Sequence, residues 1–315
     1  MANMTRGRDA SAVLEVRGLT KRYGSFAAAN DVSFRVYRGD VFGFLGPNGA
    51  GKSTTIGMLL GLIKPTAGEI SLFGLPPSRH SEGLANVGGI IEAPAFYPYL
   101  SGRDNLRALA HLRPGTTRQR IDEVLDLVGL GEAATKKFGK YSLGMKQRLG
   151  IAWTLLHDPD LLILDEPTNG LDPAGMLEVR HLILSLAEQG KTIFVSSHLL
   201  HEIEQVCDRV AVIRRGEVII EGDVDELLSQ TERLIIRTPQ LRDAAALLRG
   251  LPGVRDIEAA DDLLRVDAPE VRPATLNAEL VRAGIEVDEL RRERASLEST
   301  FLEVTGDQWE GNAAA

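Results

Sequence analysis

The chain has 315 residues, enough for one large domain or two ordinary ones, and 43% of them are hydrophobic and 25% charged. This composition is close to that of globular proteins and excludes a disordered or collagen-like chain. The formal net charge of -8 excludes binding driven by overall attraction to anions, so we expect no nucleic-acid partner. The single cysteine, Cys207, excludes a disulfide framework and a multi-thiolate metal site, and we expect it to be buried.

The apolar segments of the chain do not predict a membrane span. The nearest candidate ends at Lys64 and Pro65 and falls short of the roughly 18 residues that a spanning helix needs. Residues 1–12 lack the apolar segment of a secretory signal, so we expect them to form a disordered leader. We expect residues 307–315 to form a disordered tail.

From Val13 onward, short β-rich runs alternate with helical patterns, which predicts an α/β fold with a partly parallel sheet. The predicted strands are VLEVR, VSFRV, VFGFL, EISLF, GGIIE, LLILD and TIFVSS. Residues 101–157 instead carry apolar residues at intervals of three and four, which predicts a helical subdomain over about 95–158, inserted between two strands. The run RVAVIRRGEVIIEGD then predicts a hairpin that turns at Arg215 and Gly216.

A short helix, DVDELLSQ, separates this hairpin from a second pattern that begins near Thr231. Its elements are LIIRT, DAAALLRGL, VRDIEA, LLRVDA, PATLNAELVRAG and VDELRRE, in the order βαββαβ, and a last helix lies near LESTFLEV. This order is typical of a small ferredoxin-like or similar α+β module. We therefore predict an accessory domain over 231–306, after a larger domain over 13–230.

The strongest chemical signal is GPNGAGKST, which lies between the strand VFGFL and the helical run TIGMLLGLI. It fits the template G-x-x-x-x-G-K-[ST], in which glycines let the backbone approach phosphate oxygens and the next helix directs its N–H groups at the same anion. The motif predicts a nucleoside triphosphate site, with a ligand-free glycine-rich turn as the alternative. Its residues are Gly46, Pro47, Asn48, Gly49, Ala50, Gly51, Lys52, Ser53 and Thr54.

Three side chains of this motif have separate predicted roles. Lys52 supplies a mobile positive charge for the β- and γ-phosphates, and Ser53 offers a hard oxygen to Mg²⁺. Thr54 adds a further hydroxyl for phosphate.

The second signal is LLILDEP, an apolar run that ends in two carboxylates. This pattern is typical of a buried central strand whose carboxyl end opens into a ligand crevice. Asp165 is then placed to hold Mg²⁺, while Glu166, as the next residue of an extended strand, is expected to point to the opposite side and to activate a water. An acidic strand cap without catalytic function is the alternative.

Together these motifs, with YSLGMKQRLGIA between them and SSHLLHEIE after them, resemble the ATP-binding subunits of ABC transporters. The resemblance runs from about Val13 to Leu228. It implies a P-loop NTPase cassette of the ABC type, with a RecA-like core, a β-subdomain and an inserted helical subdomain. It also implies an ATPase that uses ATP and Mg²⁺ and in which Glu166, His198 and Lys52 are catalytic.

The same resemblance assigns further residues. Tyr23 matches the aromatic position that stacks on adenine, and Ser142 and Gly144 match the signature that binds the γ-phosphate held by a second subunit. Asp172 matches a loop at the dimer seam. Taken alone, each residue has an ordinary alternative: a surface or core tyrosine for Tyr23, a helix N-cap for Ser142, a turn for Asp172 and a structural histidine for His198. No chemistry is assigned to the remaining histidines, His80, His111, His157, His181 and His201.

The chain departs from the family pattern at two sites. Glu92 stands where most members carry a glutamine that links the Mg²⁺ site to the membrane subunit, and a carboxylate there remains a hard oxygen ligand. The signature reads SLGMK in place of the usual SGGQ, so Leu143 replaces a glycine and Met145 removes an amide.

The loop APAFYPYLSG and the appended module are similar to the branch of the family that serves ABC-2-type exporters of antibiotics, bacitracin-like peptides and lantibiotics. This implies a homodimer that encloses two ATP molecules, a separate integral-membrane permease as partner, and a cytoplasmic location on the inner face of the membrane. The alternatives are a non-transport ABC ATPase that acts on ribosomes or DNA, a P-loop kinase or a switch GTPase. A single cassette and the SLGMK, LDEP and SSH motifs favour the transporter subunit.

Overall fold

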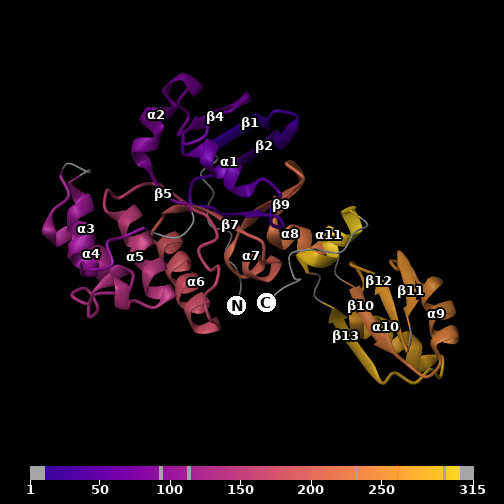
Figure 1. The fold of residues 1–315 in the computed structure, drawn as a ribbon. Coiled ribbons are helices and arrows are strands. Elements are labelled where there is room, and N and C mark those ends of the chain that lie inside the picture. Colours follow the sequence, from indigo (N-terminus) through magenta and orange to yellow (C-terminus); the bar gives the residue numbers. More distant parts are fainter. Residues whose placement is uncertain are drawn as a thin grey trace. The chain divides into compact units, whose positions relative to one another are not determined.

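The computed structural model describes residues 11–91, 95–111, 115–230, 233–260, 262–293 and 296–305. These residues form two compact units, which meet in sequence between Gly222 and Asp223. The first unit contains two sheets and the helical subdomain, and the second contains one antiparallel sheet with its helices (Figure 1). In the described residues, no helix is both long enough and apolar enough to cross a membrane.

The central sheet of the first unit has the strand order β5-β6-β7-β3-β8-β9. Its strands are β3 (Val41–Leu45), β5 (Val87–Ile90), β6 (Leu161–Leu164), β7 (Thr192–Ser197), β8 (Arg209–Arg214) and β9 (Glu217–Asp223). Pairing is parallel between β5 and β6, β6 and β7, β7 and β3, and β3 and β8. The predicted α/β fold with a parallel sheet is therefore confirmed.

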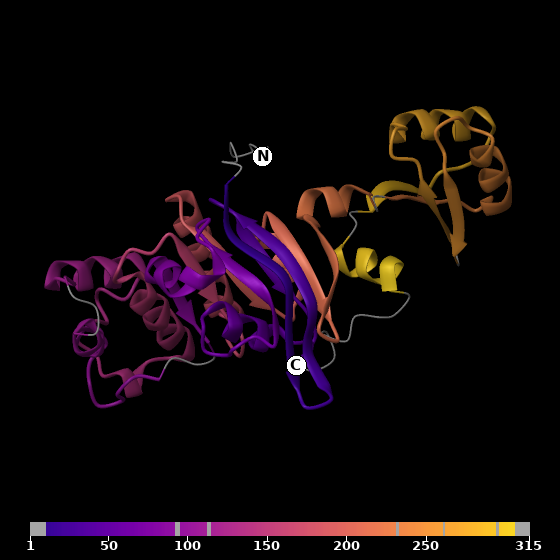
Figure 2. The same ribbon diagram turned by 90° about the horizontal axis from the view of Figure 1, so that it is seen from above.

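A smaller antiparallel sheet of order β2-β1-β4 lies beside the central sheet (Figure 2). Its strands are β1 (Ala12–Tyr23), β2 (Phe26–Tyr37) and β4 (Ala67–Leu72). One core joins the two sheets with α1 (Lys52–Leu59), and Phe34 of β2 stacks within it on Phe42 of β3 at 5.5 Å between ring centroids. This packing fixes α1, and hence the loop before it, against the end of β3.

Helices complete the first unit. The helical subdomain consists of α3 (Gly102–Ala110), α4 (Arg118–Leu127) and α5 (Leu143–Leu155), which group together in both views. The other helices are α2 (His80–Gly83), α6 (Pro173–Glu188) and α7 (Leu200–Val206). The chain between β8 and β9 turns at Arg215 and Gly216, whose positive φ angles of 51° and 85° suit the tight hairpin turn predicted there.

The second unit has the strand order β11-β12-β10-β13, and all three pairings are antiparallel. Its strands are β10 (Arg233–Arg237), β11 (Asp256–Ala260), β12 (Leu263–Asp267) and β13 (Glu289–Glu293). Helices α9 (Leu241–Arg249) and α10 (Pro273–Arg282) supply the rest of its own core. The extra C-terminal sheet expected from the βαββαβ pattern is therefore present.

The predicted first domain ends at residue 230, whereas the second unit of the structure begins at Asp223 and so includes α8 (Val224–Gln230). Helix α8 packs against α11 (Leu297–Thr305) of the same unit. The Thr300 hydroxyl donates to the Leu227 carbonyl oxygen at 3.5 Å. Residues 1–10 of the predicted leader and 307–315 of the predicted tail lie outside the described residues. Cys207 is buried as expected, and burial raises the pKa of its thiol well above the usual value.

Candidate functional site

The loop Gly46–Gly51 connects β3 to α1 and therefore stands at the carboxyl end of a central strand. Gly51 is the N-cap residue of α1 and has a φ of 108°. A Cβ added at Gly51 would lie 2.3 Å from the Ala28 carbonyl oxygen, so only glycine fits there. The N–H groups at the start of a helix such as α1 favour an anion.

Lys52 is only 5% exposed, although it carries a charge. Its ammonium group donates to the Gly46 carbonyl oxygen at 2.7 Å and to the Pro47 carbonyl oxygen at 3.3 Å. The same nitrogen lies 3.1 Å from Oε1 of Glu166. The loop carbonyls and one carboxylate thus compensate the buried charge, and they hold it where the template expects phosphate.

The two carboxylates after β6 are arranged differently from the sequence prediction. The strand ends at Leu164, and Glu166 has a φ of 45°. The prediction that Glu166 continues an extended strand is therefore wrong. A left-handed turn of the backbone, rather than the alternation of a strand, separates the side chains of Asp165 and Glu166.

Ser196, on β7, contacts both of these acidic residues, although the motifs predicted no role for it. Its hydroxyl donates to Oδ1 of Asp165 at 2.5 Å and accepts the backbone N–H of Glu166 at 2.9 Å. The sequence carries one signal for this contact. Neighbouring parallel strands end at the same edge of a sheet, so the two serines just before His198, at the end of β7, could be expected near the carboxylates that follow β6.

His198 follows β7 and faces the same carboxylate as Lys52. Its Nδ1 lies 3.0 Å from Oε2 of Glu166. The structure therefore brings Lys52, Glu166 and His198 into one contact group, with each oxygen of Glu166 bound to a different partner. Asp165 lies beside this group and is 4% exposed.

Ser142 and Asp172 each begin a helix. The Ser142 hydroxyl accepts the N–H of Met145 at 3.3 Å at the start of α5, and a carboxylate oxygen of Asp172 accepts the N–H of Gly175 at 3.0 Å at the start of α6. A Cβ added at Gly144 would lie 3.7 Å from the Gly175 Cα, so the first turns of the two helices are adjacent. Ser142 and Asp172 are both exposed.

Tyr23 ends β1 and is 52% exposed. The Lys21 ammonium lies 5.0 Å from the centroid of its ring. Tyr23 stands at the turn between β1 and β2. Glu92, the third metal ligand predicted from the sequence, lies outside the described residues.

The donor groups present fit Mg²⁺, which prefers oxygen ligands and keeps several waters and phosphate oxygens in its shell. Ser53 presents an exposed side chain in the first turn of α1, and Asp165 presents a carboxylate just after β6. Within the described parts of the chain, no cluster of three histidine, cysteine or acidic residues could hold a metal by itself. A metal bound together with nucleotide needs only one or two protein ligands of this kind.

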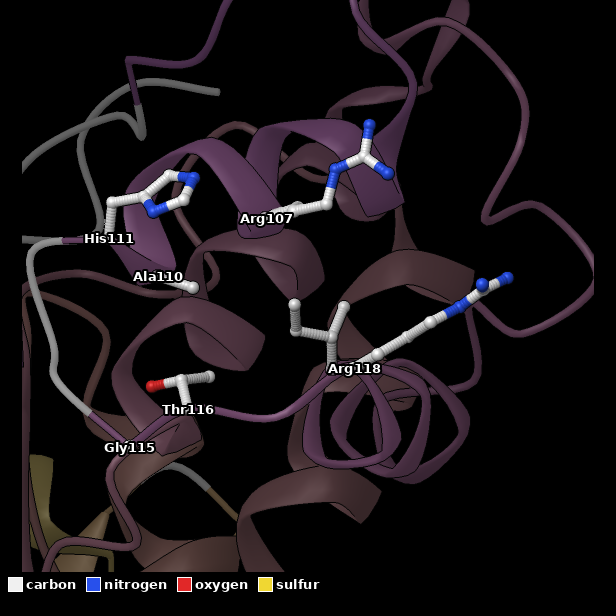
Figure 3. A pocket seen from close by; sticks show the side chains of 7 residues that line it. Arg107, Ala110, His111, Gly115, Thr116 and Arg118 are labelled. Atoms are coloured by element: carbon white, nitrogen blue, oxygen red, sulfur yellow. The ribbon is translucent and has the colours of Figure 1, made fainter.

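A separate cavity of about 360 Å³ lies in the helical subdomain, between α3 and α4 (Figure 3). Its walls include the side chains of Arg107, His111, Thr116 and Arg118. None of the site residues that the motifs predicted is among the described residues that line it. We assign it no role.

Comparison with known proteins agrees with this geometry. Residues 29–169 match the family model described as ABC transporter. The chain is 44% identical over 300 residues to the bacitracin transport ATP-binding protein BcrA of Bacillus licheniformis, covering 94% of this chain and 98% of that protein. The chain belongs to the ATP-binding proteins of ABC transporters. This ABC ATPase is also 43% identical over 213 residues to the lantibiotic transport ATP-binding protein SrtF of Streptococcus pyogenes, covering 68% and 92% of the two chains.

A solved structure extends the comparison to an oligomer. It is the dimeric post-hydrolysis state of the ATP-binding cassette MJ0796 bound to ADP and Pi, which is 25% identical, with a TM-score of 0.60, over 67% of this chain and 98% of that chain. The ABC cassette fold, the ATP-binding function and the ATPase class expected from the sequence are therefore confirmed. Another solved structure, cbiO1 from Clostridium perfringens, is described as part of the ABC transporter complex cbiONQ; it is 27% identical, with a TM-score of 0.63, over 76% of this chain and 96% of that chain.

Proposed function

We propose that the protein is the ATP-hydrolysing subunit of an exporter that moves a drug, an antibiotic or a peptide through a separate integral-membrane permease of the ABC-2 type. The observation that carries this proposal is the 44% identity to a bacitracin transport protein over 94% of the chain. A match of this length includes the C-terminal unit as well as the cassette. The proposed location is cytoplasmic, on the inner face of the cell membrane.

In the proposed reaction, Glu166 is the general base that accepts a proton from the attacking water. Lys52 stabilises the charge that develops on the phosphoryl group, and His198 holds the γ-phosphate and the water in position. The contacts of Glu166 with Lys52 at 3.1 Å and with His198 at 3.0 Å support this assignment. The carboxylate that we propose as the base contacts both of the groups that we propose to bind phosphate.

We further propose that Ser53, Asp165 and Glu92 hold Mg²⁺, which supplies positive charge to the β- and γ-phosphates when it is bound. The loop residues Gly46 to Thr54 enclose the triphosphate, and Tyr23 stacks on the adenine. The exposure of the Tyr23 ring and the glycine fit at Gly51 support these roles.

A second copy of the chain completes each nucleotide site in this proposal. Ser142 and Gly144 of one copy contact the γ-phosphate bound by the other, and Asp172 lies at the seam between the copies. The exposed first turns of α5 and α6 support this role, since a helix N-terminus favours an anion.

The loop after β5 is the proposed contact with the permease. Tyr97 and Tyr99 are 50% and 64% exposed, and their ring centroids are 5.7 Å apart. The buried Asn105 holds this loop in place, because its amide oxygen accepts the Tyr97 N–H at 2.8 Å and its amide nitrogen donates to the Ser101 carbonyl oxygen at 3.0 Å.

For the C-terminal unit we propose a ferredoxin-like accessory domain over about 231–306. The strand order β11-β12-β10-β13 supports this. In that order β12 lies between β10 and β11, the two strands of the first βαβ segment, and β10 lies between β12 and β13, the two strands of the second.

Substitution of Glu166 by Gln tests the catalytic assignment. Gln keeps the shape of the side chain but cannot accept a proton, so we expect ATP turnover to fall by about 10²- to 10⁴-fold while ATP binding is retained. Steady-state phosphate release and equilibrium nucleotide binding measure the two effects. Near-normal turnover of Glu166→Gln would overturn the assignment.

The export role needs a separate experiment. We expect the chain to co-purify with membranes only when the permease encoded beside its gene is co-expressed, and we expect the pair to lower cellular accumulation of a peptide antibiotic. The Glu166→Gln variant with the same permease is the matched control. Membrane association without any permease, or association with ribosomes instead, would favour the non-transport alternative.

A further inference from the structure

We propose that Ser196 is a positioning residue of the ATPase site, whose single hydroxyl sets both the metal-binding carboxylate of Asp165 and the backbone of the general base Glu166. This inference rests on the roles proposed above for the two acidic residues. It adds a third, uncharged residue, on β7, which links the Asp165 carboxylate to the Glu166 backbone.

The two hydrogen bonds of Ser196 use its hydroxyl in both directions. A serine hydroxyl has one donor and two acceptor positions. Here the proton goes to Oδ1 of Asp165 at 2.5 Å, a length typical of a bond to a charged carboxylate, and a lone pair accepts the Glu166 N–H at 2.9 Å. Ser196 is 0% exposed, so water does not replace either bond.

The first bond orients the Asp165 carboxylate. The hydrogen bond from Ser196 fixes the position of Oδ1, and with it the rotation of the carboxylate. Groups that orient a metal ligand in this way affect metal affinity or activity by about 10- to 100-fold when they are removed.

The second bond stabilises an unfavourable backbone conformation. Glu166 has a φ of 45°, in the left-handed region that is unfavourable for a residue with a side chain. In this conformation its carboxylate reaches both Lys52 and His198. Loss of the Ser196 acceptor would leave the N–H of Glu166 without this partner and would favour a change of backbone that moves the carboxylate.

The neighbouring serine does not share this position. Side chains alternate along a strand, and the Ser197 hydroxyl accepts the N–H of Leu199 at 2.9 Å instead. Of the serine pair at the end of β7, it is Ser196 that contacts the Asp165 carboxylate and the Glu166 backbone N–H.

Substitution of Ser196 by Ala tests the proposal. We expect kcat to fall by about 10- to 100-fold, the KM for ATP to change little, and the Mg²⁺ concentration for half-maximal rate to rise. A second readout does not depend on turnover: binding of Mn²⁺ to the complex with ADP, followed by electron paramagnetic resonance, should weaken by about 10- to 100-fold, with ADP affinity in the absence of metal unchanged. Ser196→Thr keeps the hydroxyl and should restore most of both properties.

Thr192→Val is the matched control. Thr192 begins the same strand, is 0% exposed, and its hydroxyl accepts the Gly39 N–H at 3.0 Å, so this variant also loses one buried hydroxyl, at the opposite end of β7. We expect it to lose stability to a similar degree but to keep wild-type Mn²⁺ affinity and kcat. Equal losses of kcat in Thr192→Val and Ser196→Ala, or unchanged Mn²⁺ affinity and kcat in Ser196→Ala, would overturn the proposal.

Asp165→Asn and Glu166→Gln, measured in parallel, separate this inference from the proposed function. If both lose hydrolysis and Ser196→Ala does not, the role of Ser196 fails while the catalytic assignment stands. If Asp165→Asn and Glu166→Gln keep wild-type turnover, the catalytic assignment itself fails, and the inference fails with it.

Discussion

At the scale of single residues, the site is defined by contacts that restrict which side chains fit. Glu166 accepts from Lys52 through one oxygen and contacts His198 through the other, while its backbone N–H is bound by Ser196. The approach of Gly51 to the Ala28 carbonyl oxygen is just as restrictive. The sequence identified Lys52, Glu166 and Gly51 because each belongs to a motif.

Gly51→Ala tests how much the fit at the loop contributes to stability. Gly190→Ala is the control, because Gly190 also has a positive φ, 87°, but open space where the Cβ would lie. Both variants should lose roughly 1–2 kcal/mol from the left-handed backbone, and Gly51→Ala a further 1–3 kcal/mol or so from the clash. Urea unfolding measures the difference, and nucleotide binding should be lost only in Gly51→Ala. Equal losses of stability in the two variants would contradict the close fit of Gly51 against the Ala28 carbonyl oxygen.

At the scale of elements, the apolar runs of β3, β6 and β7 predict buried parallel strands, because each is covered on both faces. The end of β6 was less predictable. Glu166 is not a glycine, and its left-handed conformation depends on a hydroxyl from another strand, so no local signal shows it. Ser196 was missed for the same reason, since its partners are remote in sequence.

Helices α6 and α7 are joined by an ion pair that local sequence does not indicate either. Nη2 of Arg180 lies 2.7 Å from Oε1 of Glu202, with side-chain exposures of 17% and 9%. Removal of one partner leaves a buried charge, so Arg180→Met and Glu202→Gln should each cost about 3–5 kcal/mol. The double variant should lose clearly less than the sum, as measured by urea unfolding in a double-mutant cycle. Additive losses would show that the two charges do not interact.

At the scale of the whole molecule, the chain combines a nucleotide-binding cassette with a second unit that has its own core. Alternation of strands and helices predicted both parts, and motif order predicted the family that the comparisons confirmed. The packing of α8 with α11, from the far end of the chain, was harder to predict. Such long-range packing leaves no periodic pattern in the sequence.

A crystal structure of the protein with Mg²⁺ and a slowly hydrolysed ATP analogue tests the central claim most directly. We predict a triphosphate enclosed by Gly46 to Thr54, with the Lys52 ammonium moved from Glu166 to the phosphate oxygens. The claim would be contradicted by a loop that stays unoccupied at saturating analogue, with Lys52 still paired with Glu166.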